Sequence, residues 1–442
     1  MNEQTFYHAL QVDEDQCIAC ARCMKSCPTE AIRVINGHAS ISEHRCVDCG
    51  NCYKVCPVKA IYIKQDDFDQ IFNYKCRVAL VPAVFLGHFP EDIPASRVYS
   101  VLKEIGFTHV FEVESAVQIF AQAKNQYAMQ GEGEKPLISS FCPAIVRLIQ
   151  VRFPSLVDNI IPVKAPVDIV AKYACKVLTE SNIPRKDIGL FYISPCAAKV
   201  AAVKSPVGEE KSLVDGIINM DELYNRVQKK MKELGKNYTV PGFSMARLSS
   251  DAVLSTLTNG ERRLCIAKRS LAIDEIHNVT EFLEKVENEE IEDIEFLELR
   301  ACDQSCAGGV LACQNRFLIS ECMYARARKI AERERNGEIT NDSKLDAERD
   351  YLLQDVRVSA VQPRSMLALD DDVAKALEKM EKINKIQCML PQIDCGVCGS
   401  PSCNALAEDM VCRDASLQRC VFMNNAQNPE MKEIWGEEKF KK

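Results

Sequence analysis

The chain has 442 residues, of which 47% are hydrophobic and 27% are charged, and its formal net charge is −8 at pH 7. This composition is typical of a globular protein with two or three domains, and the acidic balance without a basic block argues against nucleic-acid binding. The longest mostly apolar stretch, residues 78–86, is far too short to cross a membrane, and the N-terminus lacks a basic-then-apolar leader. We therefore expect a cytoplasmic protein without a membrane segment.

The 23 cysteines are the most informative feature of the sequence. They are too many for an ordinary cytosolic enzyme, and the chain is too long for a typical secreted disulfide scaffold. Many lie in tight clusters near the two ends, with isolated cysteines between them. Since a reducing compartment keeps cysteines as thiols or metal thiolates, this spacing indicates metal sites.

Residues 1–76 contain the spacing C-x2-C-x2-C-x3-C-P twice. It is typical of a small α+β ferredoxin-like domain with two [4Fe-4S] clusters, in which the fourth cysteine of each run binds the other cluster. Thiolates are soft, anionic ligands that suit iron, and zinc ribbons are the alternative. We predict one cluster on Cys17, Cys20, Cys23 and Cys56, and the other on Cys46, Cys49, Cys52 and Cys27.

Residues 77–365 alternate between strand and helix patterns, which predicts an α/β domain with mostly parallel sheets. Single cysteines follow three of the predicted strands, where open α/β sheets place their ligands: Cys142, Cys196 and Cys302, with Cys306 one helical turn further on. A lone cysteine after a strand is usually just a small buried residue, but four of them could hold a further cluster. The strands are predicted at 77–85, 109–113, 135–141, 188–194, 263–268 and 294–300, and the helices at 96–106, 167–178, 221–234 and 279–288.

The segments around these cysteines are SFCPAIVRL, SPCAAK and ELRACDQSCAGG. In order and spacing they resemble the three signature segments of the iron-only (FeFe) hydrogenases, TSCCPxW, MPCxxK and ExMACxxGCxxGG. The flanking segments GFTHVFEVESA, VKAPVDI and VDGIINMDEL are also similar to the family's. The resemblance covers roughly residues 13–320, and it implies a two-lobed hydrogenase catalytic domain.

The resemblance further implies an H-cluster, the site where this family splits or forms H2. A [4Fe-4S] cube would be held by Cys142, Cys196, Cys302 and Cys306, and Cys306 would bridge to a two-iron subsite with carbonyl, cyanide and bridging dithiolate ligands. Lys199 matches the lysine that pairs with a cyanide, and Pro82 and Ala83 match the loop against the subsite. Such a site takes H2 and protons, and it needs hydrogenase maturation proteins.

Several positions depart from the family's catalytic pattern. Phe141 stands where the family has the cysteine that relays protons, and phenylalanine cannot transfer a proton. Ser194 replaces a methionine, Val167 a glutamine and Arg300 a methionine, and residues 115–131 contain no acidic side chain although the family's relay carboxylates come from that segment. These changes favour a slow hydrogenase that resembles the sensory or regulatory branches.

Residues 366–442 form the third predicted domain. It begins with a charged helix at about 370–386 and ends in the spacing C-x2-C-x4-C-x16-C, which resembles a small single-[4Fe-4S] domain; zinc is the alternative. A helix at 405–412 would cover the cluster. The charged stretch 325–350 is predicted to form a helix, a loop and a second helix on the surface. A homodimer contact through this stretch is compatible with the sequence. The proposed ligands are Cys395, Cys398, Cys403 and Cys420.

The remaining cysteines and the histidines receive no function. No two histidines lie three or four residues apart, and neither a phosphate loop nor a dinucleotide fingerprint is present, which makes bound NAD(P) or flavin improbable. The unassigned cysteines are Cys76, Cys175, Cys265, Cys313, Cys322, Cys388 and Cys412.

Four functions stay open on the sequence: a slow or sensory FeFe hydrogenase, a catalytic one with another proton route, an electron-transfer or cluster-assembly protein with cubane clusters only, and a corrinoid-linked redox activator. The first is favoured because it accounts for the central segments, for Lys199 and for the loss of the relay at Phe141. It would carry four [4Fe-4S] clusters in all and would exchange electrons with a redox partner such as a ferredoxin or a signalling protein.

Overall fold

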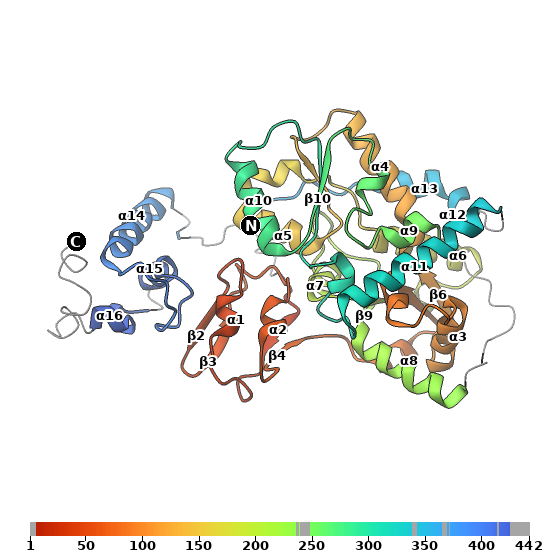
Figure 1. Cartoon of the computed structure of the whole chain (residues 1–442), viewed down its shortest axis with the longest axis horizontal. Coiled ribbons are helices and arrows are strands. Elements are labelled where there is room, and N and C mark those ends of the chain that lie inside the picture. Colours follow the sequence, from red (N-terminus) through yellow and green to blue (C-terminus); the bar gives the residue numbers. More distant parts are fainter. Residues whose placement is uncertain are drawn as a thin grey trace. The chain divides into compact units, whose positions relative to one another are not determined.

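The computed structural model describes residues 6–235, 238, 248–337, 343–364, 369–370, 372–412 and 415–424. They form two compact units (Figure 1). Unit 1 comprises Met1–Ala9, Val47–Cys49 and Ile63–Pro363, and unit 2 comprises Leu10–Cys46, Gly50–Tyr62 and Arg364–Lys442. The two cysteine-rich ends of the chain therefore fall mainly into the same unit.

The first sheet of unit 1 has four parallel strands in the order β6-β5-β8-β9. The central strand β8 is buried along its whole length, as expected when helices cover both faces of a parallel sheet. Helix α6 packs against β5, β6 and β8, while α3 packs against β6 and α8 against β8 and β9. The bounds are Cys76–Val81 (β5), His109–Glu112 (β6), Ile188–Ser194 (β8), Gly216–Asn219 (β9), Ala95–Ile105 (α3), Pro166–Glu180 (α6) and Met220–Leu234 (α8).

Strand β5 is shorter than the predicted 77–85. It ends at Val81 because Pro82 has no N–H to donate to a neighbouring strand. The chain continues as a fully buried 3-10 helix, η2, over Ala83–His88. The sequence pattern had also missed the edge strand β9, which is only four residues long.

The second sheet has three parallel strands in the order β10-β11-β7. These are Ser270–Ile273, Phe296–Leu299 and Leu137–Ile138, in that order. Together the two sheets confirm the predicted α/β class, with parallel strands in both lobes of unit 1. Helix α10, Ile276–Glu287, follows β10 as predicted.

The predicted strand at 263–268 is wrong. Here the backbone bonds to a side chain instead of to a strand: the amide of Asn125 donates to the carbonyl of Leu264 at 2.9 Å and accepts from the N–H of Ile266 at 3.2 Å. Ile266 is 53% exposed, so its apolar side chain does not mark a core-facing position. The strand in this region is β10, which begins at Ser270.

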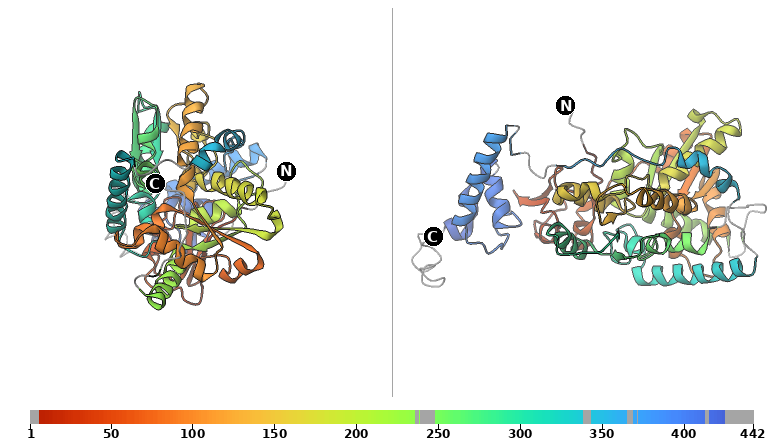
Figure 2. Two further views of the ribbon diagram at one scale, coloured as in Figure 1. Left: turned by 90° about the vertical axis from the view of Figure 1, so that its right-hand side faces the viewer. Right: turned by 90° about the horizontal axis from the view of Figure 1, so that it is seen from above.

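The other helices of unit 1 surround the two sheets. The long helix α11 packs against α9, η2 and η7 and runs along one side of the unit (Figure 2). Among the described residues, no helix is both long and apolar enough to cross a membrane. These elements are Val117–Met129 (α4), Pro143–Arg152 (α5), Ala197–Lys204 (α7), Ser250–Leu254 (α9), Arg316–Arg335 (α11), Ser343–Ala347 (α12), Arg349–Leu353 (α13), Phe68–Asn73 (η1), Val113–Ala116 (η3), Pro154–Asn159 (η4), Arg185–Asp187 (η5), Arg262–Leu264 (η6) and Ser305–Gly308 (η7).

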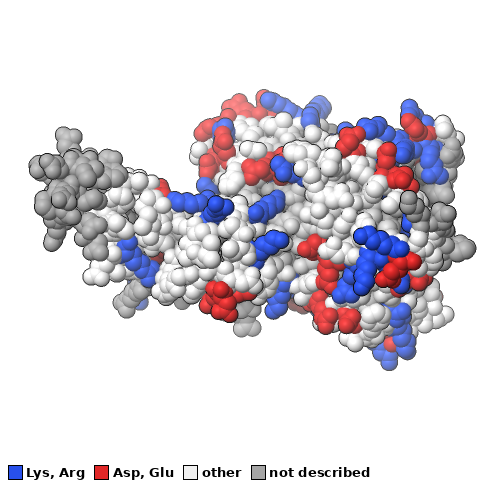
Figure 3. Space-filling view, turned by 60° about the horizontal axis from the view of Figure 1, so that its bottom comes forward, with Lys and Arg blue, Asp and Glu red and all other residues white. Residues whose placement is uncertain are grey.

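On the face shown in Figure 3, basic and acidic side chains are interspersed over unit 1. Neither sign forms a continuous stripe on that face. Such a mixture produces no extended field of one sign for a charged polymer to follow.

Unit 2 contains the two cysteine runs and the C-terminal segment. Strand β1 pairs with β4, and β2 pairs with β3 in an antiparallel ladder. The C-terminal helices α14 and α15 pack together around a small core that includes Leu390 and Leu406. The bounds are Leu10–Val12 (β1), Ile32–Ile35 (β2), His38–Ile41 (β3), Ile61–Ile63 (β4), Arg22–Lys25 (α1), Asn51–Val55 (α2), Val373–Met389 (α14), Cys403–Val411 (α15), Leu417–Arg419 (η8) and Val421–Asn424 (α16).

The two cysteine runs repeat the same backbone conformation. Ala19 in the first run and Asp48 in the second have positive φ angles of 52° and 54°, and each lies one residue before the second cysteine of its run. The residues before the short helices α1 and α2 are also left-handed, Ala21 at 59° and Gly50 at 83°. The duplication seen in the sequence is therefore a duplication of the fold.

A buried ion pair within unit 1 joins helix α5 to the loop of the second cysteine run. Nη1 of Arg147 lies 2.6 Å from Oδ2 of Asp48, and both side chains are at most 1% exposed. Asp48 also contacts the His8 ring at 2.9 Å and accepts from the Ala9 N–H at 3.0 Å. Since Arg147 is five residues after Cys142 and Asp48 directly precedes Cys49, the pair connects two cysteine-bearing segments of unit 1.

We expect Arg147→Met to destabilise unit 1 by about 3 kcal/mol, because removal of one partner leaves a buried carboxylate without its cation. Urea unfolding would measure the loss. The matched control is Arg152→Met on the same helix, where the partner Glu284 is 47% exposed and the expected cost is below about 1 kcal/mol. Equal costs for the two variants would contradict a special role for the buried pair.

Candidate functional site

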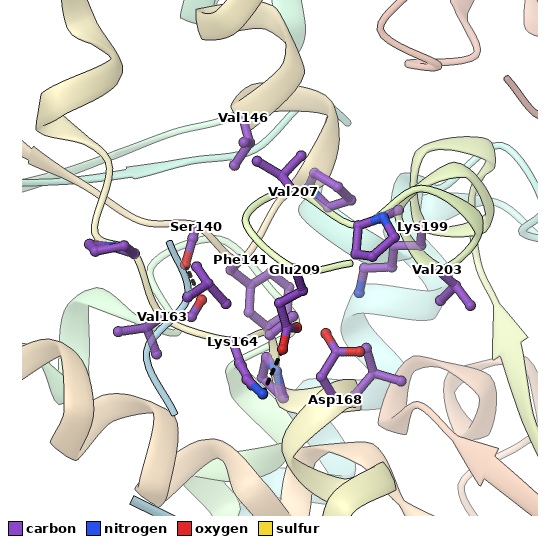
Figure 4. A pocket seen from close by; sticks show the side chains of 18 of the residues that line it. Ser140, Phe141, Val146, Val163, Lys164, Asp168, Lys199, Val203, Val207 and Glu209 are labelled. Carbon is purple, nitrogen blue, oxygen red and sulfur yellow. Dashed lines mark hydrogen bonds and ion pairs between the residues drawn. The ribbon is translucent and has the colours of Figure 1, made fainter. Parts of the chain in front are cut away.

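A cavity of unit 1 lies where loops from its two sheets approach each other (Figure 4). It encloses about 890 Å³ of empty space, part of which is open to solvent. Its walls are mostly apolar, with Phe141 from the loop after β7, Pro143 from the start of α5 and several valines. The polar groups on these walls are Ser140, Lys164, Asp168, Tyr192, Lys199 and Glu209.

Three of the central cysteines follow the carboxyl ends of parallel strands, as predicted, and the fourth, Cys306, lies in the 3-10 helix after the third. Cys142 precedes α5, Cys196 precedes α7, Cys302 follows β11 and Cys306 is in η7. Burial raises the pKa of the Cys196 thiol, and the nearby charges of Cys302 and Cys306 raise it further. Arg300 is close enough to interact with both Cys306 and Cys142. The structure therefore brings the four thiols into one neighbourhood.

Lys199 lies beside these cysteines and on the cavity wall. Its ammonium is 4.7 Å from the centre of the Phe141 ring. Burial alone would lower the pKa of Lys199, but the charges of Cys306, Tyr192 and Cys196 raise it overall, so the side chain stays cationic. Within the described parts of the chain it has no ion pair or hydrogen bond. A half-buried cation without a carboxylate partner favours an anionic ligand.

The other predicted positions surround the same neighbourhood. The Phe141 ring is buried, and the guanidinium of Arg300 lies 3.7 Å from its centre. The hydroxyl of Ser194 donates to the Cys196 carbonyl at 2.8 Å and so holds the loop that carries this cysteine. Pro82 precedes η2 and Ala83 begins it, where the predicted subsite loop would lie.

Glu114 is a buried acid that the sequence reasoning missed. It is only 1% exposed, and its carboxylate accepts a hydrogen bond of 2.5 Å from the Ala83 N–H. Burial raises its pKa to about 7, while the Ala83 bond and the charge of Lys199 act in the other direction. In the sequence it directly precedes the segment 115–131, which contains no acidic side chain.

A buried network of four charges also escaped the sequence analysis. Glu261 pairs with Lys124 and, at 2.8 Å, with Arg300, which lies 3.5 Å from Glu298. All four side chains are at most 3% exposed. The sequence feature that could have indicated this network is a charged residue within an apolar strand pattern, such as Glu298 in FLELR. The partners of Glu298 in the network are distant in sequence, so the pattern does not identify them. Through Arg300 the network fixes the Phe141 ring.

Asp168 is the second missed acid, and it faces the cavity (Figure 4). Burial raises its pKa to about 7, and repulsion from Glu209 adds to the increase. The Ser212 hydroxyl at 3.3 Å and the charge of Lys164 oppose it. Lys164 itself forms an ion pair with Glu209 at 2.6 Å. The cation near Asp168 is therefore paired with Glu209 and not with Asp168.

The Asp168 shift predicts a pH dependence of stability. In the unfolded chain this carboxyl ionises near pH 4, whereas in the folded protein it ionises near pH 7. Between these values only the folded state keeps the proton, so stability should fall as the pH rises. Asp168→Asn should remove the loss of stability that this carboxyl causes between about pH 4 and pH 7. The measurement is the urea midpoint of unfolding at several pH values in this range, on protein without a two-iron subsite.

The control for this titration is Asp158→Asn, which removes a carboxylate at an exposed position of unit 1. Its profile should follow that of the wild type. A wild-type profile that Asp168→Asn leaves unchanged would show that the acid ionises at its ordinary pH.

The N-terminal runs provide hydrogen bonds to their own sulfurs. In both runs the fourth cysteine accepts from the N–H four residues later, Cys27 from Ala31 and Cys56 from Ala60, each at 3.2 Å. Burial and the neighbouring charges of Cys17 and Cys20 raise the pKa of Cys23 to about 11, which places these three thiols together. N–H bonds to sulfur stabilise the negative charge that a cluster ligand carries.

The four C-terminal cysteines line one small cavity, together with Gly396 and Leu406. Burial, followed by the charges of Cys395 and Cys420, raises the pKa of Cys398. Four thiols around one enclosed space fit a cubane cluster. The lining cysteines are Cys395, Cys398, Cys403 and Cys420.

Within unit 2 the C-terminal segment packs against the N-terminal runs. Arg33 forms two hydrogen bonds to Asp409, at 2.6 and 3.0 Å, and Arg45 pairs with Glu408 at 2.5 Å. The N–H of Val34 also donates to the Gly399 carbonyl at 2.8 Å. The predicted N-terminal and C-terminal cluster sites are thus held in one compact body.

Three family models match the chain. The iron only hydrogenase large subunit, C-terminal domain, matches residues 76–260, a 4Fe-4S dicluster domain matches residues 10–64, and an Fe-S cluster family matches residues 390–422. The matches confirm the resemblance recognised in the sequence.

Two curated relatives are hydrogenases. Iron hydrogenase 1 of Clostridium pasteurianum is 24% identical over 324 residues, which are 66% of this chain and 54% of the relative. NADP-reducing hydrogenase subunit HndD of Solidesulfovibrio fructosivorans is 24% identical over 124 residues, which are 26% of this chain and 21% of the relative. The matched regions thus span about half of the first relative and a fifth of the second.

Solved structures share the fold. Two variants of FeFe-hydrogenase HydA1 from Chlamydomonas reinhardtii match with a TM-score of 0.50 at 14% and 15% identity. Each match covers 68% of this chain and 97% of the solved chain. At this identity the likeness concerns the fold of the central domain.

Proposed function

Because the chain belongs to the FeFe-hydrogenase family and carries iron-sulfur domains at both ends, we propose that it splits or forms H2 slowly, in a sensory or regulatory role. The observation that carries this proposal is that the four central cysteines lie in one neighbourhood, and that Lys199, which interacts with two of them, lines the adjoining cavity without an ion pair to a described residue. The family assignment alone would not require that arrangement in this chain.

The residues fit the family's H-cluster. Cys142, Cys196, Cys302 and Cys306 would hold a [4Fe-4S] cube, and Cys306 would also bridge to a two-iron subsite in the cavity. When bound, this group supplies the metal chemistry that splits H2 heterolytically. Lys199 would neutralise a cyanide ligand, and the apolar walls would exclude water from the subsite.

The slow rate follows from the groups around Phe141. Its ring cannot carry a proton, and it is buried beneath the Arg300 guanidinium. Where a relay carboxylate would be useful, helix α4 instead contributes Lys124, which is paired with Glu261. Proton delivery would therefore limit turnover, which suits a protein that reports H2 more than one that produces it.

Electrons would leave through the clusters of unit 2. The shared packing of the two cysteine-rich ends supports exchange between the N-terminal and C-terminal clusters, and a ferredoxin or signalling protein would be the acceptor. Assembly would need hydrogenase maturation proteins. A cubane-only electron-transfer or assembly protein is the alternative, but it would have no use for an unpaired cation beside an open cavity.

The decisive measurement is infrared spectroscopy of anaerobically maturated protein. We expect bands of iron-bound carbonyl and cyanide, together with about sixteen cubane irons from four sets of four cysteines and the irons of the subsite. Lys199→Met should lose the carbonyl and cyanide bands and keep the cubanes. No bands in the wild type would favour the cubane-only alternative.

The matched control for this substitution is Lys204→Met. Lys204 ends the same helix α7 but pairs with Asp66 at 2.7 Å, away from the cavity. Its removal should leave the infrared bands in place. Loss of the bands in both variants would show that damage to α7, and not the charge of Lys199, had prevented assembly.

A second prediction concerns the relay position. Phe141→Cys should raise hydrogen turnover if the missing thiol limits proton delivery, although the lack of acids in α4 could cap the gain. The smaller side chain should also cost a few kcal/mol of stability, because it leaves a cavity in the core. Hydrogen production with an artificial donor would measure the change.

Phe120→Cys is the control for that gain. Phe120 is 1% exposed and its ring packs 6.1 Å from Phe141, so the variant loses similar packing and adds a thiol away from the cavity wall. It should be destabilised without a rise in turnover. A wild-type rate as high as that of fast hydrogenases would contradict the broken proton route.

A further inference from the structure

The hydroxyl of Tyr192 is buried without a partner. Tyr192 is on strand β8, it is 0% exposed, and its hydroxyl makes no hydrogen bond to any described residue. Buried hydroxyls are almost always hydrogen-bonded, since an unsatisfied one loses its bonds to water and gains nothing in return. An orphaned hydroxyl in a well-packed strand therefore indicates a missing partner.

The missing partner belongs in the cavity. Tyr192 lines the same space as Lys199, and the two groups are close enough to interact electrostatically. Lys199 also lacks a partner among the described residues, so one wall presents two unused donors. Burial raises the pKa of Tyr192, and the charge of Lys199 only partly offsets this, so the phenol remains a donor.

The nearby acids do not supply the acceptor. Glu114 is near both groups, but its carboxylate accepts from the Ala83 N–H and makes no bond to Tyr192. Asp168 and Glu209 also line the cavity, and they are engaged with Ser212 and Lys164 respectively. Two free donors on one wall, one of them cationic, fit an anionic ligand with exposed acceptor atoms.

We propose that Tyr192 is a second hydrogen-bond donor, beside Lys199, to the ligands of the group bound in this cavity. This inference rests on the proposed function, in which that group is a two-iron subsite with cyanide and carbonyl ligands. Tyr192 would then be a ligand-contacting residue that orients the subsite where Phe141 offers no polar contact. None of the six sequence segments that resemble the family includes Tyr192.

The test compares Tyr192→Phe with Tyr99→Phe. Both tyrosines are 0% exposed and belong to the same lobe, but the Tyr99 hydroxyl donates to Glu112 at 2.7 Å and does not line the cavity. Infrared spectra of the maturated variants and thermal unfolding of the subsite-free proteins are measured for each. The two readouts should separate the roles of the hydroxyls.

We expect Tyr192→Phe to shift at least one cyanide or carbonyl band and to leave the melting temperature of subsite-free protein unchanged or higher, because the removed hydroxyl had no partner. Tyr99→Phe should lower that melting temperature and leave the bands in place. Unshifted bands in Tyr192→Phe would overturn the inference and would mean that water satisfies the hydroxyl. Absence of bands in the wild type would overturn the proposed function and this inference with it.

Discussion

The contact between Arg147 and Asp48 sets the position of two parts of unit 1 that the sequence keeps far apart. Helix α5 begins directly after Cys142, and Asp48 lies between Cys46 and Cys49. Two opposite charges in the interior must stay together, because separation would leave each without solvent or partner. Within unit 1, helix α5 is therefore held against the segment Val47–Cys49.

A second buried network shapes the cavity. Arg300, held by Glu261 and Glu298, lies over one side of Phe141, and Lys199 lies near the same ring. The ring thus contacts two cations, and of these Arg300 is the one that protein carboxylates neutralise. Lys199 is therefore the cation of this region that has no carboxylate partner among the described residues, and an anion with several acceptor atoms is the ligand that it would stabilise.

The sequence predicted those features that depend on spacing along the chain. The cysteine runs and the strand-then-cysteine pattern located the thiols that the structure brings together. In unit 1 the periodicity located strands β5, β6, β7, β8 and β11 and helices α3, α6, α8 and α10. It failed at 263–268, because the side chain of Asn125, far away in sequence, replaced the neighbouring strand as hydrogen-bond partner. Tyr192 and Glu114 were missed for a related reason: a polar residue within an apolar run shows neither its burial nor its lack of a partner.

The duplicated cysteine runs differ at one informative position. Ala19 and Asp48 occupy equivalent places with the same left-handed backbone, and the N–H bonds to Cys27 and Cys56 are also equivalent. Whatever these shared features contribute to the reduction potential of a bound cluster, they contribute equally to both. A difference in potential, and hence a preferred direction for an electron, must come from what is not duplicated. The buried charges of Asp48 and Arg147, with the His8 ring, contact the second cysteine run only. Divergence after duplication would therefore have given two initially equal clusters different reduction potentials, so that electron transfer between them is favourable in one direction.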